Sequence, residues 1–152
     1  MMTTWKQVSH WKNSIIVYKH AINVADKKYP HSSVIHNNLG IALFVDQKKT
    51  EAISHFKMAI KLNPNHSKSH HNLGVALVAD RKNEEAISHY KMAIKLNPNY
   101  IKAHYNLGVI LLQKGEIKEA IHHFTKTLRL RPGFVRARDH LELALLRSEK
   151  IR

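Results

Sequence analysis

Apolar positions recur with the period of an α-helix in two successive stretches, residues 67–79 and residues 84–96. The stripes, spaced i, i+3 or i+4, are His70, Leu73, Gly74 and Leu77 in the first stretch, and Ala86, Tyr90, Ala93 and Leu96 in the second. Asn83 is placed to cap the second helix at its N-terminus. Asn97-Pro98 ends that helix, because the residue before proline avoids the α region. The pattern predicts a helix–turn–helix hairpin over residues 67–100.

This hairpin pattern repeats along the chain at a fixed interval of 34 residues. The interval separates all four prolines and three of the five glycines: Pro30, Pro64, Pro98 and Pro132, and Gly40, Gly74 and Gly108. Residues 51–65 and 85–99 differ only by Phe56 against Tyr90, and residues 119–133 form a more divergent third copy. A fixed period of this length is typical of stacked units, none of which can bury its apolar face alone.

The repeated positions resemble the signature of tetratricopeptide repeats. Three units supply its Leu-Gly, large apolar, small, aromatic, small and proline positions: Leu39, Gly40, Leu43, Ala52, Phe56, Ala59 and Pro64; Leu73, Gly74, Leu77, Ala86, Tyr90, Ala93 and Pro98; Leu107, Gly108, Leu111, Ala120, Phe124, Thr127 and Pro132. The resemblance covers residues 33–134. It departs from the family at Thr127 and at the usual tryptophan position, which is histidine in each unit. It implies an all-α fold, a right-handed α-solenoid of helix–turn–helix repeats with a concave surface lined by the first helices.

We expect one domain over residues 1–152, with incomplete units at both ends. Residues 1–32 predict an N-terminal helix, a partial repeat, and residues 33–66, 67–100 and 101–134 predict repeats 1, 2 and 3. Residues 135–152 predict a polar capping helix, because Glu142 takes the place of the repeated glycine and charged residues surround it. Trp5 and Trp11 are expected to cover the exposed end of the first hairpin.

A second stripe on the predicted first helices is not needed for the hairpin core and predicts a binding groove. It consists of Val34, Asn37, Asn38, Ile41 and Phe44 in the first unit, Lys68, His71, Asn72, Val75 and Val78 in the second, and Lys102, Tyr105, Asn106, Val109 and Leu112 in the third. The alternative is that the apolar members of this stripe pack between neighbouring units. Part of the stripe is expected to do both.

Asn38, Asn72 and Asn106 are the most specific candidates for ligand binding. An amide both donates and accepts, so it can pair with a peptide backbone whatever the side chains of that peptide are. Packed helices lie about 8–10 Å apart, and an extended strand rises about 3.3 Å per residue, so one asparagine would meet about every third residue. The resemblance implies the same role, since such an asparagine ladder holds peptide backbone in the repeats of O-linked N-acetylglucosamine transferase. The alternative is local bonding of each amide.

Some tetratricopeptide repeat proteins carry a clamp for the two carboxylates of an acidic C-terminal peptide. This chain offers Asn72 and Lys102 for it, but Asn37, Ile41 and Asn106 occupy the other clamp positions. The clamp is incomplete, so we do not expect this specific class of partner. Lys68, Lys102 and Arg136 still form a basic line along one rim of the predicted groove. This line favours acidic partners in general.

The formal net charge of +14 raises the question of nucleic-acid binding. The charge is spread over all segments, and no nucleic-acid motif or interleaving of aromatic and basic residues accompanies it. Several lysines fall late in predicted second helices, where they complement the helix dipole. We therefore expect no specific nucleic-acid partner. A basic nucleic-acid binder is kept as the least favoured alternative.

Thirteen histidines make metal binding the next candidate chemistry. Two columns recur once per unit: His36, His70 and His104, and His55, His89 and His123. Members of a column lie about one helix spacing apart, whereas zinc binds nitrogen at about 2.0–2.1 Å, so a column cannot chelate one ion. We expect no metal site and no cofactor, with His36, His70 and His104 as half-buried substitutes for tryptophan. Acidification through pH ~6.5 should charge many histidines and destabilise the protein.

Enzymatic chemistry finds no support in the chain. It has no cysteine, no nucleophile elbow, no phosphate-binding glycine-rich loop and no repeated pair of carboxylates, so we expect no catalytic residue. The longest apolar stretches, such as residues 41–45, are far shorter than the ~20 residues that span a bilayer. We expect a soluble, cytoplasmic chain, although the absence of cysteine does not choose a compartment, and membrane association through a partner is an alternative.

The sequence thus predicts a non-catalytic adaptor that binds an extended peptide or a segment of a partner protein in its concave groove. The N-terminal stretch, residues 4–22, also resembles, more weakly, a junction in large bacterial membrane proteins. In those proteins a glycosyltransferase-like region is followed by a tetratricopeptide tail. A soluble tail of such a membrane glycosyltransferase system is therefore the second candidate. The identity of the partner and the oligomeric state are not indicated by the sequence.

Overall fold

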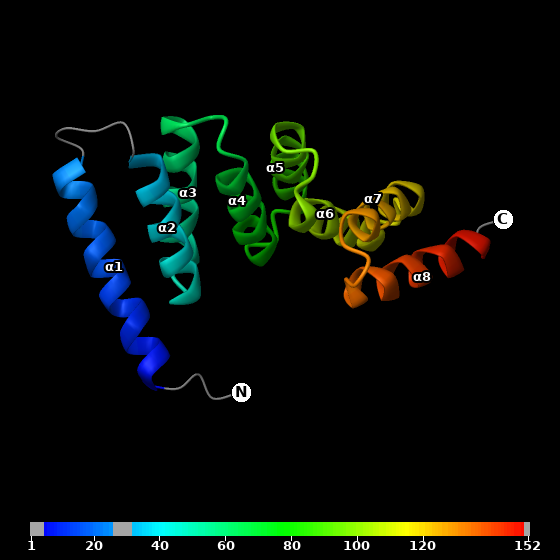
Figure 1. The fold of residues 1–152 in the computed structure, drawn as a ribbon, viewed down its shortest axis with the longest axis horizontal. Coiled ribbons are helices and arrows are strands. Elements are labelled where there is room, and N and C mark those ends of the chain that lie inside the picture. Colours follow the sequence, from blue (N-terminus) through cyan, green and yellow to red (C-terminus); the bar gives the residue numbers. More distant parts are fainter. Residues whose placement is uncertain (1–4, 26–31, 151–152) are drawn as a thin grey trace.

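The computed structural model describes residues 5–25 and 32–150, with side chains described for residues 12–23 and 33–150. The described residues form eight α-helices and no strand (Figure 1). The helices are α1 (Trp5–Ala25), α2 (Ser32–Val45), α3 (Lys49–Leu62), α4 (Ser67–Ala79), α5 (Asn83–Leu96), α6 (Ile101–Lys114), α7 (Ile117–Leu130) and α8 (Val135–Glu149). The all-α prediction is confirmed.

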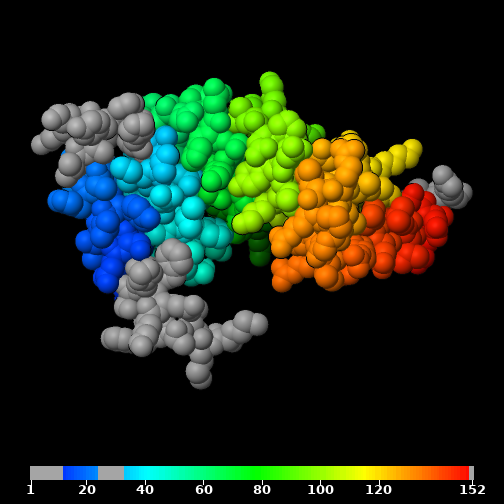
Figure 2. Space-filling model, viewed as in Figure 1, coloured from blue at the N-terminus to red at the C-terminus, as the bar shows by residue number. Residues whose placement is uncertain are grey.

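Successive helices pack against one another, so the molecule is a row of antiparallel hairpins (Figure 1). The hairpins are α2–α3, α4–α5 and α6–α7, and α8 closes the row beside α7. In the space-filling view the segments follow one another in sequence order along the long axis (Figure 2). The core runs through all three hairpins, because each contributes two fully buried leucines and one buried aromatic ring: Leu39, Leu43 and Phe56; Leu73, Leu77 and Tyr90; Leu107, Leu111 and Phe124.

The tight turn inside each hairpin holds one residue in the left-handed region. Gln47 (φ 63°), Arg81 (φ 61°) and Gly115 (φ 83°) occupy equivalent positions. The amide after each of them donates to a carbonyl five residues back, as Lys82 N does to Leu77 O at 2.9 Å, which is a Schellman-type helix end. Asn83 is the first residue of α5 rather than its cap, and the preceding Lys82 makes no side-chain capping bond, so the predicted asparagine cap is wrong.

The two ends of the row differ from a full hairpin. Helix α1 packs on α2 through Ile15, and α8 packs on α7 through Ala137 and Ala144, which are fully buried. The surface of α8 is mixed rather than uniformly polar, because the helix also exposes three leucines: Leu143, Leu145 and Leu146. The side chains of Trp5 and Trp11 lie outside the described residues. Within the described ranges, no helix is both long and apolar enough to cross a bilayer.

Candidate functional site

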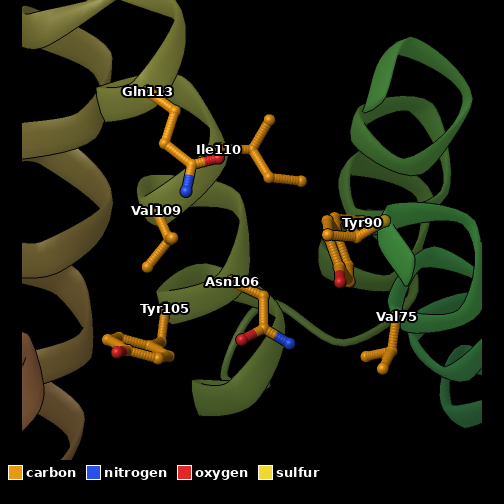
Figure 3. Close-up of a pocket in the computed structure, with 8 residues that line it drawn as sticks. Val75, Tyr90, Tyr105, Asn106, Val109, Ile110 and Gln113 are labelled. Atoms are coloured by element: carbon orange, nitrogen blue, oxygen red, sulfur yellow. The ribbon is translucent and has the colours of Figure 1, made fainter. Parts of the chain in front are cut away.

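An apolar hollow lies between α4 and α6, with a volume of about 230 Å³. Its lining comes from the outer face of both helices and from one ring of α5: Val75, Val78, Tyr90, Tyr105, Asn106, Val109, Ile110 and Gln113. In the close-up, Asn106 extends from α6 toward the side of the hollow that carries Val75 and Tyr90 (Figure 3). We call this surface the α4–α6 groove. Five of the predicted binding residues line it: Val75, Val78, Tyr105, Asn106 and Val109.

The groove side chains are held by a chain of hydrogen bonds that links successive hairpins. Asn106 Nδ2 donates to His71 Nε2 (3.2 Å). His71 Nδ1 then donates to Asn72 Oδ1 (3.1 Å), since an amide oxygen can only accept. Asn72 Nδ2 donates to Asn37 Oδ1 (2.9 Å). We call these residues, with Asn38, the amide relay; it connects α6, α4 and α2.

Asn37 is the end point of the relay and is buried, with 4% of its surface exposed. Its oxygen also accepts from the fully buried hydroxyl of Ser69 (3.2 Å), and its Nδ2 donates to Asn38 Oδ1 (3.4 Å). A buried amide with satisfied partners fixes the register between α2 and α4. The local bonding that was left open as the alternative role occurs at Asn72, and both Asn72 and Asn106 also bond residues of the preceding hairpin, which was not predicted.

The predicted binding residues divide into three groups by exposure. Asn37, His71 and Leu112 are buried and leave little surface for a ligand, which corrects their placement in an open groove. Leu112 is covered because α8 packs over the end of α6, where Arg147 Nη1 donates to the Leu112 carbonyl (3.4 Å). The half-buried group is Asn38, Ile41, Phe44, Asn72, Val75, Val78, Tyr105, Asn106 and Val109, and the exposed group is Lys68, Lys102 and Arg136.

Burial raises the pKa of the Tyr90 hydroxyl above its usual range, and a hydrogen bond with Asn106 opposes this shift in part. The pKa of His71 is lowered, mainly by burial and to a smaller extent by the charge of Lys102, while the bond with Asn72 raises it. His71 is therefore neutral at pH 7, which keeps its Nε2 lone pair available to Asn106. The groove is therefore lined by neutral groups, which do not exchange protons with a ligand.

Each hairpin also contains a histidine pair, and the sequence patterns did not predict these contacts. The two predicted columns meet across the hairpin, with Nδ1–Nδ1 distances of 2.9 Å for His36 and His55, 3.1 Å for His70 and His89, and 3.0 Å for His104 and His123. The 19-residue separation repeated in each unit, read together with the hairpin geometry, was the signal that could have found them.

The hydrogen bonds of two pairs fix their tautomers. His70 Nε2 donates to the Pro64 carbonyl (2.9 Å) and His104 Nε2 to the Pro98 carbonyl (3.0 Å), because a carbonyl only accepts. Nδ1 of each of these rings is therefore unprotonated in the neutral pair and accepts from the second histidine. The ring centroids lie 5.1–5.4 Å apart with their planes inclined by 26–42°, and an N–H···N bond joins the two rings of each pair.

The second histidine of each pair resists protonation. Burial, followed by the neighbouring His104, His122 and Lys91, lowers the pKa of His123 to about 4. Burial and the partner ring likewise lower the pKa values of His55 and His89. Among the described residues, no group of three or more histidine or acidic side chains is arranged to hold a metal ion.

Comparison with known proteins agrees with this architecture. A tetratricopeptide repeat model matches residues 33–66 and 101–134, a second one matches residues 55–88, and a TPR repeat model matches residues 82–115. No curated protein matches the chain.

Solved structures share the fold at low sequence identity. A crystal structure of MamA has a TM-score of 0.81 at 25% identity over 95% of this chain and 76% of that one. A second MamA structure has a TM-score of 0.75 at 23% identity over 99% and 98%. The first TPR of Spaghetti (RPAP3), bound to the HSP90 peptide SRMEEVD, has a TM-score of 0.73 at 23% identity over 75% and 90%. With repeat models matching throughout residues 33–134, the chain belongs to the tetratricopeptide repeat family.

Proposed function

We propose that the chain is a non-catalytic adaptor that binds an extended peptide, or an extended segment of a partner protein, along the α4–α6 groove. The observation that carries the proposal is the composition of this groove. Val75, Val78 and Val109 form an apolar surface that the protein's own packing leaves half exposed, and amide groups lie beside it. Apolar contact with a few placed polar groups is the usual composition of a recognition site.

The groove asparagines keep hydrogen-bonding capacity after the relay is formed. An amide has two N–H donors and two acceptor lone pairs. Within the described residues, Asn72 uses one N–H and one lone pair of its oxygen. Asn106 donates one N–H to His71 and also bonds the Tyr90 hydroxyl. The remaining hydrogen-bonding capacity of each amide can pair with the backbone of a ligand while the relay keeps the side chains oriented.

The similarity to a peptide-bound structure supports a peptide as the ligand class. The first TPR of RPAP3 holds the short peptide SRMEEVD, which contains two glutamates, an aspartate and two apolar residues. The acidic and apolar side chains of such a peptide suit the present chain, whose exposed groups near the groove are basic, although its clamp for two carboxylates is incomplete. SRMEEVD is therefore the first peptide to test, together with partner segments captured from the native lysate.

The direct test replaces Asn38, Asn72 and Asn106 by alanine together. We expect the captured segment to bind this variant at least tenfold more weakly, because about three charge-neutral hydrogen bonds of about 0.5–1.5 kcal/mol each are lost. A matched control replaces Asn13, Asn23 and Asn65, which are exposed outside the groove. Circular dichroism verifies that both variants stay folded. Equal affinity of the groove variant and the parent would refute the assignment of these asparagines.

A further inference from the structure

A basic cleft of about 400 Å³ lies beside the α4–α6 groove, where α4 and α6 begin and the chain turns into α8. Lys68 and Lys102 extend into it from the first turns of α4 and α6, and Arg131 from the turn after α7. The rings of Tyr100 and Phe134 form its wall. We call this site the rim cleft. It includes Lys68 and Lys102 of the predicted basic line, and Arg131 takes the place that the sequence pattern gave to Arg136.

The three cations of the rim cleft have no anionic partner. No carboxylate lines the cleft, and no ion pair within the described ranges involves Lys68, Lys102 or Arg131. Lys48 and Lys82 differ from them, since each has a carboxylate oxygen at 2.8 Å. Three like charges around one hollow attract an anion more strongly than a single exposed lysine does.

The aromatic wall of the rim cleft is also the support of the groove. The Tyr100 ring packs on His71 of the amide relay, with centroids 4.9 Å apart. The Phe134 ring packs on Tyr105 of the groove lining at 4.8 Å, and the Arg131 guanidinium lies 5.6 Å from the Phe134 centroid. Because Phe134 of the cleft contacts Tyr105 of the groove, the two sites adjoin at this pair of rings, and a ligand can extend from one into the other. Apolar and cationic surfaces meet here without an intervening acidic side chain.

We propose that the rim cleft binds the acidic side chains of the partner segment whose apolar residues occupy the α4–α6 groove. This inference rests on the proposed function and adds a specificity: aspartate or glutamate must flank the apolar residues on one side. Carboxylates accept charge-assisted hydrogen bonds from lysine and arginine, and arginine binds them with two parallel N–H groups. A nucleic-acid backbone fits less well, because it needs cations along its whole track and the adjoining surface is apolar.

The test uses two labelled peptides, Ac-Leu-Ile-Val-Gly-Glu-Asp-Glu-NH2 and its neutral match Ac-Leu-Ile-Val-Gly-Gln-Asn-Gln-NH2, with the full chain at physiological salt. The rim variant Lys102→Gln/Arg131→Gln is compared with the control Lys57→Gln/Lys91→Gln, which removes the same charge from exposed positions of α3 and α5. We expect the parent to prefer the acidic peptide by about tenfold, and the rim variant alone to lose that preference. The groove variant Val75→Ser/Val109→Ser should weaken the binding of both peptides by the same factor.

The arms separate failure of the rim cleft from failure of the groove. Equal binding of the two peptides by the parent, including no binding of either, would overturn the rim-cleft assignment. An equal loss in the rim variant and the control would also overturn it, because total charge would then explain the preference. If a single-stranded DNA oligonucleotide displaced the acidic peptide and itself depended on Lys102 and Arg131, the cleft would be a phosphate site instead. Unchanged peptide binding by the groove variant would refute the proposed groove while leaving the rim result readable.

Discussion

A methyl group placed on Gly74 would lie 2.6 Å from Cε1 of the Tyr90 ring. Tyr90 is 2% exposed, and three atoms of its ring lie within 3.0 Å of the position of that methyl group. Gly40 meets Phe56 and Gly108 meets Phe124 in the same way, with closest distances of 2.6 and 2.8 Å. Close contact between a glycine of one helix and an aromatic ring of the next is therefore the packing unit that every hairpin repeats.

Gly74→Ala is expected to destabilise the protein despite the higher helix propensity of alanine. Overpacking of a tight core costs about 1–3 kcal/mol, and the propensity gain of about 1 kcal/mol offsets part of it. Urea unfolding should therefore show a net loss of up to about 2 kcal/mol. Gly133→Ala is the control, since a Cβ there meets nothing within 4 Å. A Gly74→Ala variant as stable as the control would mean that the Tyr90 ring moves freely.

Arg81→Gly should stabilise the protein. Arg81 holds φ at 61°, a conformation that is unfavourable for residues with a Cβ, whereas the equivalent turn residue of the last hairpin is already Gly115. The expected gain is about 0.5–1 kcal/mol in the free energy of unfolding, measured by urea titration. The reverse change, Gly115→Arg, should destabilise by a similar amount. A loss of stability in Arg81→Gly, or a gain in Gly115→Arg, would contradict the left-handed assignment of the turn.

Asn37→Ala tests the amide relay as a structural element. Its removal leaves the buried Ser69 hydroxyl and the Asn72 amide without their shared acceptor, a loss expected to cost about 1–3 kcal/mol. Asn23→Ala, at an exposed position of α1, should change stability by less than about 0.5 kcal/mol. Thermal unfolding of both variants makes the comparison. Equal stabilities would show that water replaces the bonds of Asn37 without loss.

The histidine pairs predict a loss of stability in acid. The pKa of His123 is lowered from 6.5 to about 4 in the folded protein, so the unfolded chain binds protons more readily between these values. The stabilisation is fully present above about pH 6.5 and is lost progressively as the pH falls toward 4. The pKa values of His55 and His89 shift in the same direction. The melting temperature should therefore fall steadily between pH 7 and pH 4.5.

A matched pair of variants assigns this pH dependence. His123→Gln removes a titrating ring that meets His104, and its melting temperature should depend less on pH than that of the parent. His20→Gln removes an exposed ring of α1, outside the histidine pairs, and should keep the slope of the parent. Identical slopes in all three proteins would place the acid sensitivity outside the histidine pairs.

The fold could be predicted from the sequence because the residues that end helices or allow close packing recur periodically. Gly74 and Pro98 recur at an interval of 34 residues, and the position of Tyr90 is aromatic in every unit. Small, aromatic and helix-ending residues at fixed places in each unit indicate how its two helices pack. The surface of the C-terminal helix α8 was harder to predict, because its exposed leucines have the same spacing as buried leucines in the other helices. The exposure of Leu145 and Leu146, 45% and 58%, is therefore known only from the structure.

The candidate site was less predictable than the fold. Its positions on α4 and α6 follow from helix periodicity, and Val75, Asn106 and Val109 do line the groove. The pairing of side chains between hairpins does not follow from periodicity, because it depends on distances between helices that are far apart in sequence. For this reason the burial of His71 and the contribution of Arg131 to the rim cleft emerged only from the structure.

The central claim is that a partner segment lies along the α4–α6 groove, and site-specific photo-crosslinking tests it most directly. Benzoyl-phenylalanine is placed at Val75, at Val109 or, as the control, at Met92, which is 39% exposed on α5 outside the groove lining. The account predicts that the captured segment is linked from Val75 and Val109, at ligand residues about three apart, and not from Met92. Links from Met92 alone, or none from the two groove positions, would contradict it.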